Sequence, residues 1–124
     1  MDIRYSANPQ DVRRYTTEEL RKEFLITDLY QKDTVQATYS HVDRMVTFGC
    51  MPVNEVVSLD KGLDVWANFG TKYVLERREI GIFNLGGAGK IVADGTEYAL
   101  GYKDCLYITM GAKEVYFESK DASN

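Results

Sequence analysis

The second half of the sequence alternates between short β-prone segments and turns that contain glycine. Segments 80–85, 90–93, 97–100, 105–108 and 115–117 carry Val, Ile, Leu, Tyr and Phe, residues that suit the half-buried surface of a sheet. Turn signals separate them, among them the hairpin-forming pair Asp94-Gly95. Strands that recur about every 8–12 residues with turns between them are typical of β-sandwiches and barrels. We therefore predict an all-β fold, an antiparallel β-sandwich or barrel, with further strands over 35–39, 44–51, 53–59 and 73–79.

A single helix is predicted, near the N-terminus. Thr16 and Glu19 have the spacing of a capping box, and Leu20 and Phe24 follow on one helical face. The 124 residues are enough for one domain of ordinary size. We expect a polar arm over residues 1–16, one β-barrel domain over 17–118 and a polar tail or linker over 119–124.

Charge and hydropathy narrow the classes of partner. The sequence has 15 Lys and Arg against 19 Asp and Glu, a net charge of −4, whereas nucleic-acid binding requires a basic surface. No apolar run is long enough to span a membrane, and the first residues are too polar for a signal peptide. We expect a cytoplasmic protein that binds neither nucleic acid nor membranes. Cys50 and Cys105 have no CxxC partner and are predicted to be buried apolar side chains.

His41 and Asp43 are the acid–base pair that the sequence suggests. Residues two apart on an extended chain face the same side. The Asp43 carboxylate could then fix the tautomer of the His41 imidazole, as general-base catalysis requires. A surface histidine beside an acid is the structural alternative.

Residues 76–79 place four charges, Glu76, Arg77, Arg78 and Glu79, on a predicted strand. Alternation along that strand would direct two of the charges into a barrel. Arg77 or Arg78 could there grip a carboxylate at the barrel mouth. A salt-bridged strand end or an oligomer contact is the alternative interpretation.

The glycine-rich run 86–89 has the composition of a phosphate-binding loop but not its context. Such a loop leads into the N-terminus of a helix, whereas a predicted strand follows here. We predict a tight turn whose glycines adopt positive φ.

Several stretches of the sequence together resemble one enzyme family. They are residues 23–25, 39–44, 51–52, 75–81, 84–89 and 111–115, and the blocks LERREIG and NLGGAG are the most specific. In this order, and over nearly the whole chain, they resemble the N-terminal half of the bacterial 5-keto-4-deoxyuronate isomerases, also called 4-deoxy-L-threo-5-hexosulose-uronate ketol-isomerases. The resemblance implies a protein of two cupin-type β-barrels, of which this chain would form one.

The same resemblance implies a cytoplasmic aldose–ketose isomerase of pectin and uronate breakdown, usually a hexamer. Its zinc is held by three histidines and a glutamate of the C-terminal barrel. His41 is the single histidine here, and no ligand of that site maps onto this sequence. We expect no metal or other cofactor in this chain, and we expect the C-terminal barrel or further copies as its partners.

Three functions stay open at this stage. The chain could be the structural and oligomerising half of the isomerase, without the metal. It could be a metal-free sugar isomerase or epimerase, with His41 and Asp43 as the base, a tyrosine as the acid and Arg77 or Arg78 as the carboxylate clamp. It could also be a non-catalytic cupin that binds an acidic sugar such as a uronate.

Overall fold

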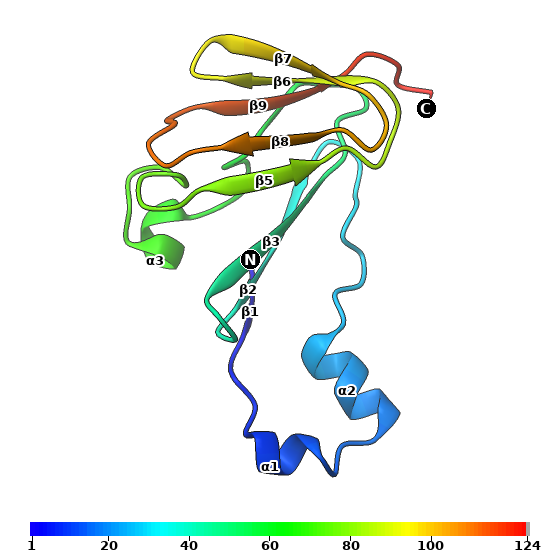
Figure 1. Cartoon of the computed structure of the whole chain (residues 1–124), viewed down its shortest axis with the longest axis vertical. Coiled ribbons are helices and arrows are strands. Elements are labelled where there is room, and N and C mark those ends of the chain that lie inside the picture. Colours follow the sequence, from blue (N-terminus) through cyan, green and yellow to red (C-terminus); the bar gives the residue numbers. More distant parts are fainter. Residues whose placement is uncertain (124) are drawn as a thin grey trace.

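The computed structural model describes residues 1–123, and the strands of this part of the chain form three sheets (Figure 1). The strands are β1 (Asp2–Arg4), β2 (Val35–Ser40), β3 (Met45–Cys50), β4 (Val57–Ser58), β5 (Ile80–Phe83), β6 (Gly89–Ala93), β7 (Thr96–Leu100), β8 (Cys105–Ile108) and β9 (Val115–Ser119). The helices are α1 (Pro9–Val12), α2 (Thr17–Phe24) and α3 (Val65–Phe69). The predicted predominance of β-structure is confirmed.

A four-stranded antiparallel sheet has the order β4-β9-β6-β7. Asp94 and Gly95, both at positive φ, close the β6–β7 hairpin as the Asp-Gly signal predicts. On the central strand β6, Ile91 is buried. Lys90, on the opposite face, forms ion pairs with Glu97 of β7 at 2.9 Å and Glu118 of β9 at 3.1 Å. One face of this sheet is therefore apolar and the other is charged.

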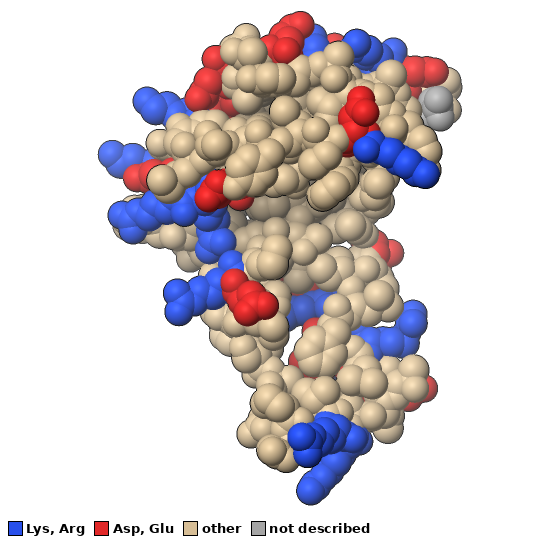
Figure 2. All heavy atoms as spheres, in the orientation of Figure 1, with Lys and Arg blue, Asp and Glu red and all other residues tan. Residues whose placement is uncertain are grey.

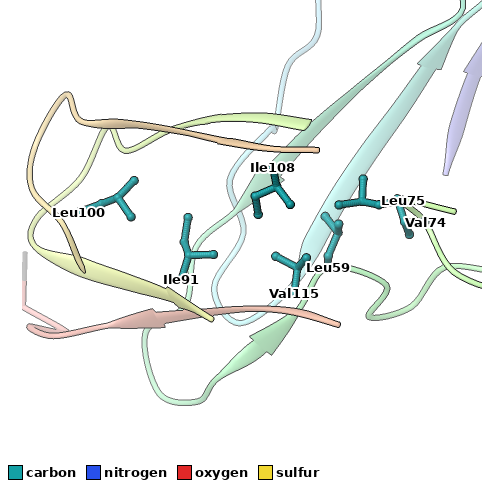
Figure 3. Close-up of a cluster of buried hydrophobic side chains, with 7 residues drawn as sticks. All are labelled: Leu59, Val74, Leu75, Ile91, Leu100, Ile108 and Val115. Atoms are coloured by element: carbon teal, nitrogen blue, oxygen red, sulfur yellow. The ribbon is translucent and has the colours of Figure 1, made fainter. Parts of the chain in front are cut away.

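The apolar core lies between this sheet and the two-stranded sheet β5–β8 (Figure 3). Ile80, Ile82 and Leu106 of the smaller sheet pack against the core cluster, whereas Phe83 and Tyr107 face outward and are exposed. This alternation is what a strand with one buried face requires. The buried cluster consists of Leu59, Val74, Leu75, Ile91, Leu100, Ile108 and Val115.

The third sheet joins the N-terminus to the β2–β3 hairpin. β1 pairs in parallel with β2, and β2 pairs antiparallel with β3. Turn 41–44 connects β2 to β3, and both Asp43 and Arg44 have positive φ there. The His41 N–H donates to the Arg4 carbonyl at 2.8 Å, which extends the β1–β2 pairing to this turn.

Helix α2 confirms the capping-box prediction. The Thr16 hydroxyl accepts from the Glu19 N–H at 3.3 Å, and the Glu19 carboxylate accepts from the Thr16 N–H at 2.7 Å. Together with α1, this helix extends away from the sheets (Figure 1). Within residues 1–123, no helix has the length and apolar character needed to cross a membrane.

The prediction of a single helix is wrong, because α1 and α3 were missed. Both are too short to show an apolar period, but both carry end signals. Asn8 caps α1, with Pro9 at its first turn. Asp64 caps α3, which ends before Gly70 at φ 66°.

Two predicted strands also need correction. Residues 73–77 form turns and bends and residues 78 and 79 are irregular, because Val74 and Leu75 are both buried in the core cluster. Adjacent residues of an extended strand face opposite sides, so a turn is needed to bury both. Of the predicted strand 53–59, only β4 forms.

The strands of the described residues do not close into a barrel, since they are divided among three sheets. The predicted closed barrel is therefore not found within residues 1–123, whereas the domain boundaries at residues 16 and 118 stay predictions.

The 86–89 run is a turn into β6, but its predicted positive φ is wrong, since Gly86, Gly87 and Gly89 lie outside that region. Gly89 packs closely against β9: a Cβ there would lie 3.1 Å from the Glu118 carbonyl oxygen, a tight contact. The Asn84 amide donates to the carbonyls of Gly87 and Gly101 at 2.8 and 3.0 Å. Residues 86–89 therefore have a structural role: they connect β5 to β6 and are held near Gly101 by Asn84.

Gly49 of β3 allows the loop before β2 to lie directly on the sheet. A Cβ at this position would lie 1.9 Å from the Leu29 carbonyl oxygen. We expect Gly49→Ala to lower the free energy of unfolding by about 1–3 kcal/mol, since the loop must move. Urea denaturation measures the change. Gly81→Ala on β5, where a Cβ meets nothing within 4 Å, is the matched control, and an equal loss in both variants would contradict this contact.

Asp33 fixes the loop that leads to β4. Its carboxylate accepts from the backbone N–H groups of Val53 at 2.7 Å, Asn54 at 2.8 Å and Glu55 at 3.3 Å, and from the Asn54 amide at 2.7 Å. These bonds, with the one from Val53 strongest, favour the ionised form and lower the pKa of Asp33 from 3.8 to about 2. They also explain why residues 53–55 bend instead of forming a strand.

A pKa below that of the unfolded chain means that ionised Asp33 stabilises the fold above pH 3.8 and loses this effect as the pH falls toward about 2. We expect Asp33→Asn to melt below the wild type at pH 6 and the two melting temperatures to converge near pH 2. Thermal denaturation followed by circular dichroism at several pH values checks this. Asp28→Asn, also at positive φ, is the control, and a gap that stays constant with pH would refute the role of the charge.

Candidate functional site

Arg78 lies against two neighbouring aromatic rings, Tyr39 and Phe69, whose centres are 6.3 Å apart, at the surface beside the third sheet. Its guanidinium carbon is 5.3 Å from the ring centre of Tyr39 and 5.2 Å from that of Phe69. It also donates to the Tyr39 hydroxyl at 3.3 Å and to the Arg44 carbonyl at 3.1 Å. Cation–π contacts of this kind orient a guanidinium while leaving part of its donor set unused.

A row of rings continues from Tyr39. The Tyr39 and His41 ring centres are 5.0 Å apart, and Tyr5 stacks on His41 at 4.9 Å with an interplanar angle of 11°. We call the residues Tyr5, Tyr39, His41, Phe69 and Arg78 the aromatic–arginine cluster.

Four separate parts of the chain build this cluster. β2 supplies Tyr39 and the following turn supplies His41; Tyr5 follows β1, which pairs with β2. Phe69 ends α3, and Arg78 lies in the segment between α3 and β5. Since these parts are far apart in the sequence, only the folded chain brings the cluster together.

Arg78 has no carboxylate partner among residues 1–123, where the ion pairs involve Arg4, Lys61 and Lys90. The acids beside it in the sequence make other contacts: Glu76 accepts from the Lys72 N–H at 2.6 Å, and Glu79 accepts from the Tyr107 hydroxyl. Figure 2 shows basic side chains along the edge of the molecule that carries α3 and the β2–β3 turn. A half-buried guanidinium without a counter-ion is suited to bind an anion, above all a carboxylate.

The structure brings His41 and Arg78 into one cluster through Tyr39, but it does not bring Asp43 to His41. Residues 41–44 form a turn, so the extended geometry expected for this pair is wrong. No hydrogen bond or ion pair joins the two side chains within the part of the chain that the structure describes. The catalytic role of His41 and Asp43 stays a prediction.

Arg77 is exposed, whereas Arg78 is half-buried. The predicted strand at 76–79 is absent, so the expected alternation of charges into a barrel is wrong there. Sequence reasoning missed Tyr5, Tyr39 and Phe69 as neighbours of Arg78. Their only signal is the abundance of tyrosine and phenylalanine, which does not separate core rings from site rings.

The sequence of this chain is similar to those of several known proteins. No family model matches it. It is 49% identical over 123 residues to 4-deoxy-L-threo-5-hexosulose-uronate ketol-isomerase of Lachnospira eligens, covering 99% of this chain and 42% of that protein. The enzymes of the same name from Halalkalibacterium halodurans and Pectobacterium carotovorum subsp. carotovorum are 47% and 43% identical, each with 44% of its length covered.

The chain is homologous to part of these ketol-isomerases. It spans less than half the length of the curated relatives it matches. The resemblance seen in the sequence is thus confirmed at the level of the family, while the position and role of this part within a whole ketol-isomerase belong to the proposal below.

The residues present do not fit the zinc site of three histidines and a glutamate expected for the ketol-isomerase family. The sequence has one histidine, and residues 1–123 contain no group of three or more His, Cys, Asp or Glu that could hold a metal ion. Burial raises the pKa of the Cys50 thiol to about 12, which disfavours the thiolate needed for metal binding. Cys105 is exposed on β8, contrary to the prediction that it is buried.

Proposed function

We propose that this chain is the N-terminal, non-metal half of a cytoplasmic 5-dehydro-4-deoxy-D-glucuronate ketol-isomerase of pectin degradation, with a structural and oligomerising role. One observation carries the proposal: a chain homologous to less than half of a ketol-isomerase contains a single histidine. A zinc site with several nitrogen ligands therefore has to come from the rest of the protein.

The fold supports a scaffolding role for this half. Strands β6, β7, β8 and β9 each contribute one side chain to the buried core cluster. The loop residues Leu59, Val74 and Leu75 complete it. Such a unit can fold around its own core and can hold its neighbours in place. The proposal assigns the proton transfer of the isomerisation to the remainder of the enzyme and assigns binding surfaces to this chain.

The purified 124-residue chain, supplied with zinc, is expected to give no turnover of 5-keto-4-deoxyuronate above the rate without protein. The physical reason is the lack of a ligand set for the metal. A coupled assay of product formation checks this, with circular dichroism to show that the chain is folded. Turnover by the chain would contradict the proposal, and its loss in His41→Ala would then favour the metal-free isomerase.

A second function, binding of an acidic sugar without catalysis, is favoured by Arg78, which lies against Tyr39 and Phe69 without a carboxylate partner among residues 1–123. A guanidinium binds a carboxylate through two parallel hydrogen bonds. Aromatic rings beside it offer apolar faces to a sugar. Glucuronate has both features, and glucose lacks the carboxylate.

We expect Arg78→Gln to weaken glucuronate binding at least about tenfold, since a charge-assisted hydrogen bond contributes about 1.5–3 kcal/mol. Isothermal titration calorimetry measures the affinity, and the fluorescence of Trp66, three residues before Phe69 in α3, is a second readout. Arg77→Gln removes an exposed charge next in sequence and is the matched control. Equal affinities for glucuronate and glucose, or an equal loss in both variants, would rule out a carboxylate site at Arg78.

A further inference from the structure

Helix α2 has an apolar face but no buried residue. Leu20 and Phe24 lie one turn apart on the same face, with exposed fractions of 38% and 49%, and Leu25 follows with 39%. The opposite side carries the charged residues Glu18 and Lys22. This division into two faces is typical of a helix that packs against another element.

An eight-residue helix is too short to be stable in water through its own hydrogen bonds. The Thr16–Glu19 capping box satisfies its first N–H groups and contributes about 1 kcal/mol. The remaining stabilisation of a short helix comes from burying its apolar face. Within residues 1–123 that burial is incomplete, because Leu20 and Phe24 keep 38% and 49% of their surface exposed.

The sheets do not cover α2, since α1 and α2 extend away from them (Figure 1). The end of α2 is tied to β1, where the Arg4 guanidinium donates to the carbonyls of Leu25 at 2.7 Å and Glu23 at 3.4 Å. An open cleft of about 630 Å³ separates the N-terminal segment from α2 and is lined by Arg4, Tyr5, Tyr15, Lys22 and Glu23 among others. Arg4 thus fixes where the helix sits without burying its apolar face.

We propose that the apolar face of α2, formed by Leu20 and Phe24, docks onto the part of the ketol-isomerase that lies outside this chain. The inference rests on the proposed function. It assigns to α2 the contact between this chain and the rest of the ketol-isomerase. More than half of each relative lies outside the matched region. A segment in the same polypeptide reaches the helix at a high effective concentration, whereas a second copy does not have this advantage.

The test uses a fusion of this whole chain to the part of the Lachnospira eligens ketol-isomerase that lies outside the match. Hydrogen–deuterium exchange is measured over residues 17–25 in the fusion and in the 124-residue chain. We expect exchange in α2 to be at least about tenfold slower in the fusion, because a docked helix must open before its amides exchange.

The double variant Leu20→Asn, Phe24→Asn in the fusion is expected to abolish the protection. These side chains are exposed in this chain, so the sheets stay folded, which circular dichroism verifies. Phe83→Asn with Leu85→Asn changes two exposed side chains of the same types, which lie in and just after β5 and not in α2. This double variant should leave the protection of α2 intact. A milder pair, Leu20→Ala with Phe24→Ala, should give an intermediate protection.

Fast exchange of α2 in the fusion would overturn the inference. So would protection in the 124-residue chain alone that rises with concentration together with dimer formation in sedimentation velocity, since the occupant is then a second copy. Uronate isomerase turnover of the fusion is measured on the same sample. Turnover with an unprotected α2 overturns the docking and leaves the proposed function standing, whereas a protected α2 without turnover supports the docking and counts against the function.

Discussion

The burial of Leu75 is the contact on which both the core and the candidate site depend. Leu75 is 2% exposed within the core cluster, and its carbonyl accepts from the Gly111 N–H at 2.7 Å. This anchor holds residues 73–77 in turns and bends instead of a strand. Arg78, three residues later, therefore lies at the surface against the rings of Tyr39 and Phe69. Packing in the interior thus determines where the one half-buried arginine of this segment presents its charge.

Local signals predicted the elements whose formation depends on local chemistry. The Asp94-Gly95 hairpin and the Thr16–Glu19 capping box have the same partners in the structure as in the sequence pattern. The outcome differs where distant residues decide the local conformation. Asp33 bends residues 53–55 from 20 residues away, and no pattern within a short window contains that information.

The candidate site was accessible from the sequence in part. His41 and Arg78 were selected for their chemistry, and both lie in the aromatic–arginine cluster. Asp43 was selected because of its spacing from His41, which fails since the chain turns there. Tyr5 reaches His41 through the parallel pairing of β1 with β2. No sequence period or motif predicts this long-range contact.

Arg4 and Tyr5 are neighbours in the chain, and this has a mechanical consequence. Arg4 holds the end of α2, while Tyr5 stacks on His41. A single peptide unit joins the two residues, so the hydrogen bond that holds the end of α2 and the ring stack beside Tyr39 start from the same short stretch of backbone at the end of β1. A displacement of that stretch changes both contacts together.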